Sequence, residues 1–204
     1  TYTAQVILGY ILSLYLACRL NHSGEKNSLI KENIYTLRNV PSLIGETFTM
    51  LEDLEHNPAL PKFPLTTKSW YMAFDNSPNS VCAMEIRIKY SEGCYHSLPY
   101  LHIDDLIDFE VKDSFITYIT NRNISDIKSH MDILSQDNNI LVITSELKTD
   151  FESSNLDFND NTNFIFIPNV DPNYSFIPTT IAGQLISYYI AVVLDNRKKI
   201  FLEL

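Results

Sequence analysis

The sequence predicts a three-layer α/β/α fold, in which a doubly wound, mostly parallel sheet follows an α-helical N-terminal arm. Two observations favour this fold. Apolar residues make up 45% of a chain of 204 residues, which is enough for one sizeable core. After residue 68, short and nearly continuous apolar runs alternate with helical stretches, as expected for parallel strands that are buried on both faces.

Residues 1–60 are predicted to form the helical arm and a linker, and residues 61–204 the α/β domain. Residues 2–20 are apolar nearly all round, which indicates a helix with little solvent exposure and favours a partner subunit or domain. Helices are also predicted at 28–38 and from 39 to about 55, where Pro41 suits a first helical turn.

The segment 56–67 holds three prolines in twelve residues and is predicted to be a connector. The four apolar runs predict strands at 69–75, 114–120, 139–145 and 163–169, with a weaker strand within "CYHSLPYL". The helical stretches between them lie at 79–92, 124–134 and 177–194. The polar segment 149–163 is predicted to be a surface loop.

Charge and cysteine content exclude several classes of protein. The net charge is −10 and the 15 Lys and Arg residues form no cluster, so the chain lacks the basic surface that a nucleic acid or an anionic membrane requires. The apolar run "VILGYILSLYLAC" has 13 residues, too few to span a membrane, and its basic residue follows it, unlike in a signal peptide. The three cysteines include no C-x-x-C pair and predict buried thiols in a reducing compartment, the cytoplasm.

Ligands of open parallel sheets bind beyond the carboxyl ends of the strands, so the loop "DNSPNS" after the first strand is the first place to expect a site. Ser77 and Ser80 begin the next helix, where they could either bind a phosphate or cap the helix. Glu85 and Lys89 have the i,i+4 spacing of an ordinary surface ion pair. His130 is predicted to lie at the surface, and no histidine spacing matches a zinc signature, so no metal site is predicted.

Four segments occur in one order along the chain: "YTAQV", "TLRNVPSLI" (36–44), "AMEIRIKYSE" (83–92) and "IPTTIAGQLISYYIAVVLD" (177–195). This order resembles the second sugar isomerase (SIS) domain of the glucosamine-6-phosphate synthases, the glutamine:fructose-6-phosphate aminotransferases. The resemblance covers nearly the whole chain and implies the SIS fold.

The resemblance also implies roles for individual residues. Glu85 matches the glutamate that moves a proton between C1 and C2 of the sugar, and Lys89 and Glu92 fall on later charged positions of the same motif. His102 is the nearest match to the histidine that opens the sugar ring, although a structural role as the cap of the following helix is equally compatible with its position. Lys199 matches a lysine that reaches the substrate; Lys198 fits that position equally well.

Two functions follow from the resemblance. In the first, the chain is the C-terminal SIS half of a phosphosugar isomerase or aminotransferase that acts on a phosphorylated hexose. The phosphate-binding loop then comes from a first SIS domain or a second subunit of a homodimer, and the ene-diol or enamine intermediate needs no metal or organic cofactor. In the second, the chain is a non-catalytic SIS-like domain for dimerisation or sugar-phosphate sensing. The replacement of a "G-R-G" turn by Phe74, Asp75 and Asn76 favours this second function.

Overall fold

The computed structural model describes residues 2–20, 27–154, 156–171 and 174–202, and the chain divides into two compact units, residues 1–46 and 47–204. The first unit consists of α1 (Tyr2–Leu20), α2 (Asn27–Arg38) and the first part of α3 (Val40–Met50). The prediction that α1 is buried is wrong for this chain by itself, since Leu8 and Leu20 are 66% and 74% exposed. One neighbouring helix, α2, covers only one side of a helix that is apolar all round.

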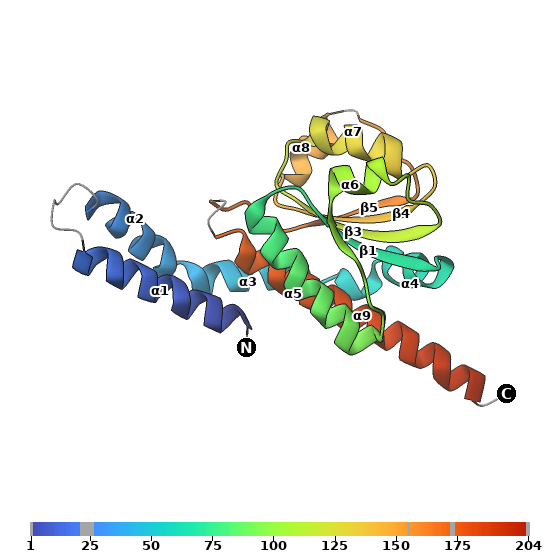
Figure 1. The fold of residues 1–204 in the computed structure, drawn as a ribbon, viewed down its shortest axis with the longest axis horizontal. Coiled ribbons are helices and arrows are strands. Elements are labelled where there is room, and N and C mark those ends of the chain that lie inside the picture. Colours follow the sequence, from blue (N-terminus) through green and yellow to red (C-terminus); the bar gives the residue numbers. More distant parts are fainter. Residues whose placement is uncertain (1, 21–26, 155, 172–173, 203–204) are drawn as a thin grey trace. The chain divides into compact units, whose positions relative to one another are not determined.

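The second unit contains a five-stranded parallel sheet with the strand order β2-β1-β3-β4-β5 and helices on both faces (Figure 1), which confirms the predicted fold class. Its remaining elements are η1 (Leu54–His56), α4 (Ala59–Thr66), β1 (Ser69–Phe74), α5 (Ser77–Cys94), β2 (Tyr100–His102), α6 (Ile103–Asp108), β3 (Ser114–Thr120), α7 (Ile124–Leu134), β4 (Asn139–Thr144), α8 (Lys148–Ser153), β5 (Thr162–Phe166) and α9 (Phe176–Leu202).

Alternating side chains of the strands form two apolar layers. In β1, Trp70 and Met72 face the layer that α4, α5 and α9 cover, whereas Ala73 faces the layer that α6 and α7 cover. In β3, Phe115 likewise faces the first of these layers and Ile116 faces the second. Both faces of the sheet are therefore buried, which explains why its strands are continuously apolar.

The sheet places the ends of three strands together. In the parallel register, Phe74 at the end of β1 lies between His102 of β2 and Ile119 of β3. The strand order reverses at β1, because the chain leaves β1 for β2 on one side and returns to β3 on the other. The carboxyl ends of β1 and β3 therefore form the topological switch point, where doubly wound sheets bind their ligands.

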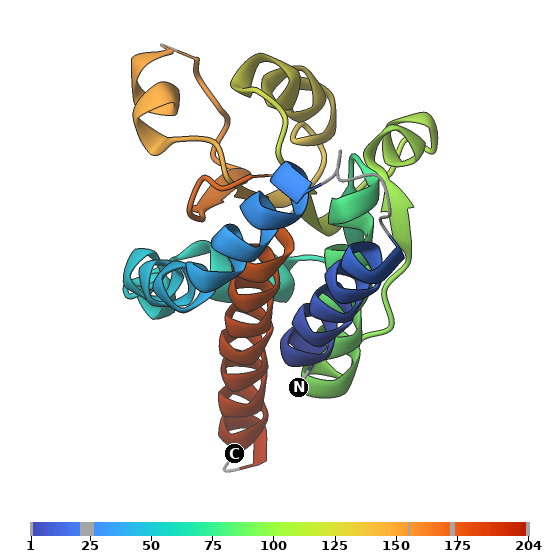
Figure 2. The same ribbon diagram turned by 90° about the vertical axis from the view of Figure 1, so that its left-hand side faces the viewer.

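The helices α5 and α9 pack side by side on one face of the sheet, and the second half of α9 extends away from it (Figure 2). A Cβ atom added at Gly183 of α9 would lie 2.2 Å from Cδ1 of Ile86 in α5. Since Ile86 is fully buried and cannot give way, the missing side chain of Gly183 allows the close approach of the two helices.

Two loop predictions are wrong. The proline-rich segment 56–67 contains α4, because Pro61 lies in its first turn, where a backbone N–H has no helical partner, and Pro64 removes only one hydrogen bond. Burial of Leu60 and Phe63 offsets that loss. The segment 149–163 contains α8, and Phe151 stacks on Phe158 with their ring centroids 5.8 Å apart.

In the part of the chain that the structure describes, one stretch, Phe176–Asn196 of α9, is long and apolar enough to cross a membrane, and half of it is buried inside the protein. The buried core helix of a globular domain has the same properties, so this stretch is weak evidence for a membrane span.

The three cysteines differ in exposure. Cys82 and Cys94 are buried in the second unit, as predicted, and burial raises the pKa of their thiols to about 12 and about 11. Cys18 of α1 is exposed, contrary to the prediction, because it borders an open hollow between α1 and α2.

Candidate functional site

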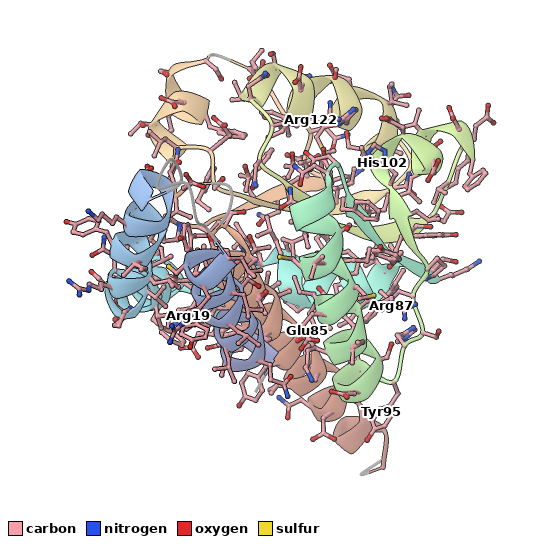
Figure 3. All side chains as sticks on the ribbon, turned by 60° about the vertical axis from the view of Figure 1, so that its left-hand side comes forward. Arg19, Glu85, Arg87, Tyr95, His102 and Arg122 are labelled. Carbon is pink, nitrogen blue, oxygen red and sulfur yellow. The ribbon has the colours of Figure 1, made fainter. Side chains whose placement is uncertain are left out.

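The second unit carries two polar regions at different places along α5. We call the first the carboxyl edge; it consists of Asp75, His102, Thr120 and Arg122, at or just after the ends of β1, β2 and β3. We call the second the α5–α9 groove, a hollow of about 320 Å³ lined by Lys89, Glu92, Gly93, Gln184, Ser187, Tyr188 and Ala191. Figure 3 shows Arg122 and His102 near the N-terminal end of α5 and Glu85 farther along the helix.

The carboxyl edge is built around the carboxylate of Asp75, whose side chain is completely buried. Its Oδ1 atom accepts a hydrogen bond from Nδ2 of Asn79 at 2.9 Å. Its Oδ2 atom lies 2.5 Å from the donor Oγ1 of Thr120 and 3.3 Å from Nε of Arg122. A more distant donor, the hydroxyl of Tyr118, lies 3.5 Å from the same oxygen. The chain thus surrounds one buried carboxylate with donors from α5, β3 and the loop after β3.

His102 makes hydrogen bonds through both ring nitrogens. Its Nδ1 atom accepts from the backbone N–H of Asp104 at 3.3 Å and so caps α6, the structural role that its position allowed. Because Nδ1 accepts, a neutral ring carries its proton on Nε2, which lies 3.1 Å from the backbone oxygen of Asp75. Both nitrogens thus maintain the local fold of the carboxyl edge.

His130 belongs to the same network, so its predicted position at the surface is wrong. Its side chain is 12% exposed, and Nδ1 lies 3.3 Å from the hydroxyl of Tyr118. Burial is the main cause that lowers the pKa of His130, and the nearby Arg122 acts in the same direction. Burial likewise raises the pKa of the Tyr118 hydroxyl. At neutral pH both groups are therefore uncharged.

Three charged residues follow one face of α5 at i, i+4 and i+7. Glu85 is 7% exposed, and its Oε1 atom lies 3.8 Å from Nζ of Lys89. Glu92 is well exposed, and its Oε2 atom accepts a hydrogen bond from the same Nζ at 2.8 Å. This hydrogen bond is the main cause that raises the pKa of Lys89. Glu85 is therefore neither a solvated surface charge nor an isolated buried one, since it shares a lysine with Glu92.

The α5–α9 groove lies beside this face of α5. On the α9 side it offers the amide of Gln184 and the exposed ring and hydroxyl of Tyr188, whereas the Ser187 hydroxyl is buried and donates to the backbone oxygen of Gln184. A second hollow of about 440 Å³ adjoins it and shares Gly93, Tyr188 and Ala191. Side chains with amide, hydroxyl and aromatic groups around an open groove suit a small polar ligand such as a sugar.

Among the described side chains, Ser80 and His102 do not contact Glu85. Ser80 lies in the first turn of α5, but the cap of that helix is Asn76, which accepts from the backbone N–H of Asn79, so the serines do not cap it. The side chains of Ser77 and Lys199 lie outside the described part of the chain. Glu85 lies eight residues beyond the start of α5, roughly 12 Å along its axis, so the helix separates it from His102.

Sequence reasoning missed Asp75, Asn79 and Arg122 as members of one cluster. The signal was present, because "FDN" and "TNR" each follow a predicted strand and the ends of parallel strands share one edge of a sheet. Which strands are neighbours was the missing information. No three His, Cys, Asp or Glu side chains form a potential metal site among the described residues.

No protein-family model and no curated protein matches the sequence, but solved structures do. The C-terminal domain of glucosamine-fructose-6-phosphate aminotransferase from Francisella tularensis has a TM-score of 0.70 at 14% identity, over 91% of this chain. The alignment spans only 51% of the Francisella chain, about half of its length.

Two further structures resemble the chain more distantly. The phosphoheptose isomerase from Neisseria gonorrhoeae has a TM-score of 0.53 at 9% identity, covering 82% of this chain and 99% of its own. The Vibrio vulnificus NanR protein, complexed with ManNAc-6P, has a TM-score of 0.54 at 6% identity, covering 93% of this chain and 76% of its own. Identities this low establish a shared fold alone, and at that level the predicted SIS resemblance is confirmed.

Proposed function

We propose that this chain is the C-terminal SIS half of a phosphosugar isomerase or aminotransferase and that it binds a phosphorylated hexose in the α5–α9 groove. The observation that carries the proposal is the row of Glu85, Lys89 and Glu92 on one face of α5. Lys89 and Glu92 line the groove, and Glu85 lies one turn before Lys89, with its Oε1 atom 3.8 Å from Nζ of that lysine. Isomerisation between C1 and C2 needs a carboxylate that removes a proton next to a carbonyl and a positive charge that stabilises the resulting ene-diolate. This row contains both.

The two carboxylates suit different parts of this reaction. Glu85 is the better protected from water, as a carboxylate that must hold and return a proton requires. Glu92 lines the open groove and anchors Lys89 by the shorter contact. We therefore assign the proton transfer to Glu85 and the positioning of Lys89 to Glu92. Lys89 stays protonated at neutral pH, because the bond to Glu92 raises its pKa, and its charge is available to the ene-diolate.

The proposal requires a partner that supplies the phosphate-binding loop, either a first SIS domain or a second copy of the chain in a homodimer. The Francisella chain, of which this chain spans about half, supports a two-part protein. The exposed apolar residues of α1, Leu8, Leu12 and Leu20, support a partner surface on the first unit. The ring-opening role of His102 and the substrate contact of Lys199 stay predictions.

A non-catalytic, sugar-phosphate-sensing role is the second candidate. One observation favours it: Lys89 forms contacts with both carboxylates of the row, so neither is free to act as a base until a ligand displaces it. The fold of the NanR protein, which is complexed with ManNAc-6P, is compatible with this role.

Substitution of Glu85 in the full-length protein separates the two candidates. Glu85→Gln should lower the turnover of fructose 6-phosphate to glucose 6-phosphate by about 10²–10⁴-fold, because the base is lost while the side-chain shape is kept. Glu152→Gln is the matched control. Like Glu85, Glu152 forms an i,i+4 pair with a lysine, here Lys148, but it lies on the exposed helix α8. Its turnover should equal that of the wild type.

Other outcomes would contradict the assignment. A loss in Glu92→Gln with full activity in Glu85→Gln would transfer the proton shuttle to Glu92. If the wild-type protein binds fructose 6-phosphate in calorimetry and produces no glucose 6-phosphate in the presence of its partner, the sensing role replaces the enzymatic one.

A further inference from the structure

We infer that Asp75 is a built-in anion: its carboxylate fills the subsite at the carboxyl edge where a doubly wound sheet would receive an anionic group of a ligand. The carboxyl edge thereby excludes phosphate and determines which part of a ligand can approach it. This inference concerns a different part of the fold from the α5–α9 groove and holds whether or not the groove binds a sugar.

The position of Asp75 is the first argument. It follows β1 directly, at the switch point between β1 and β3, and precedes Asn76, the N-terminal cap of the 18-residue helix α5. Ligands of such sheets bind at this point, and the positive end of the helix dipole favours an anion there. The carboxylate of Asp75 is the negative group that the chain itself supplies to this place.

The donors around the carboxylate are the second argument. Asn79 donates to Oδ1 at 2.9 Å. Thr120 contacts Oδ2 at 2.5 Å, and Arg122 contacts the same oxygen at 3.3 Å. An amide, a hydroxyl and a guanidinium that converge on two oxygens form a donor set that also suits phosphate oxygens. Because all three donors already contact the carboxylate, an incoming phosphate would find them occupied.

Burial of the negative charge is the third argument. The Asp75 side chain has no exposed surface, whereas the Arg122 side chain is 36% exposed. A second anion at Arg122 would lie close to a carboxylate that water does not screen, and like charges repel strongly in such surroundings. The edge therefore accepts neutral or cationic groups and rejects anionic ones.

Removal of the carboxylate should convert the carboxyl edge into a phosphate site. In Asp75→Ala, inorganic phosphate should raise the thermal unfolding midpoint by about 2–4 °C over sodium chloride of equal ionic strength, because binding to the folded state stabilises it. Asp104→Ala is the matched control: it removes one negative charge from the same edge, but from a side chain that is 61% exposed. The control and the wild type should not respond to phosphate, and Asp75→Ala/Arg122→Gln should lose the response.

Two results would overturn the inference: equal phosphate responses in Asp75→Ala and the wild type, or an undiminished response when Arg122 is also replaced. If Asp75→Ala does not fold in chloride, its refolding from urea is compared in phosphate and in chloride, and equal failure in both counts against the inference. The wild type provides an independent test, since a phosphate-dependent NMR shift of the Arg122 Nε–H signal would show that the carboxylate does not exclude anions.

Discussion

The two polar regions along α5 contain the same kinds of group, a carboxylate beside a cation. Only in the carboxyl edge is the carboxylate fully buried and bound by donors of the chain on both oxygens. At the carboxyl edge, Asp75 is fully buried and has donors on both oxygens. In the α5–α9 groove, Glu92 and Lys89 contact each other while their side chains are 62% and 36% exposed. The comparison indicates that polar residues at the expected ligand-binding edge of a fold can be structural, while more exposed charged groups lie elsewhere on the same helix.

Substitutions in the two regions test this difference. The largest expected effect is the loss of stability when Asp75 at the carboxyl edge is replaced. Asp75→Ala should lower the free energy of unfolding by about 3–5 kcal/mol, because it leaves buried donors and the Arg122 guanidinium without their acceptor. Urea denaturation in chloride buffer measures the change. Asp104→Ala should cost less than about 1 kcal/mol, and a similar loss in both variants would contradict the structural role of Asp75.

A smaller effect is expected where α5 and α9 approach each other most closely, at Gly183 and Ile86. Gly183→Ala should destabilise the protein by about 1–3 kcal/mol, because the new Cβ atom would overlap Ile86. Gly45→Ala, in a helix where the added atom has open space, should leave the stability equal or raise it. Truncation of Ile86 to Ala should recover part of the Gly183→Ala loss in a double-mutant cycle; additive effects would argue against the contact.

The smallest expected effect is in the groove itself. Lys89→Met should lower the free energy of unfolding by less than about 1 kcal/mol at neutral pH, because its pair with Glu92 is exposed and its contact with the buried Glu85 is long, at 3.8 Å. The folded-state pKa of Lys89 is raised, so the contribution is present below the unfolded-state pKa and disappears as the pH rises through the folded-state value. Denaturation curves of both proteins should therefore converge at alkaline pH, and a large difference at neutral pH would assign Lys89 a structural role.

Elements with a strong local pattern were predictable from the sequence. The strand Ser114–Thr120 and the helix Ile124–Leu134 have the predicted bounds, because a continuous apolar run and a capped amphipathic stretch carry that information locally. The helix α4 was missed because prolines are typical of loops and hide its helical pattern. Burial of Leu60 and Phe63 stabilises this helix, and that burial is not visible in the sequence.

The candidate site was less predictable than the fold. The family resemblance singled out Glu85, Lys89 and Glu92 within one segment, and helical spacing predicted the contact between Glu85 and Lys89 that the structure contains. Asp75 and Arg122 are separated by 46 intervening residues and meet only because β1 pairs with β3. No local pattern contains that pairing, so the polar cluster around Asp75 is visible only in three dimensions.

The unequal exposure of the cysteines makes the native chain suitable for spectroscopic labelling. At pH 7 a maleimide should modify Cys18 on α1 and spare Cys82 and Cys94, which are buried and whose pKa values are raised. One fluorophore or spin label would then report on the helical unit of residues 1–46 without any engineered substitution. Its mobility, followed while a phosphosugar is titrated, offers a direct readout of whether a ligand at the α5–α9 groove changes the motion of that unit.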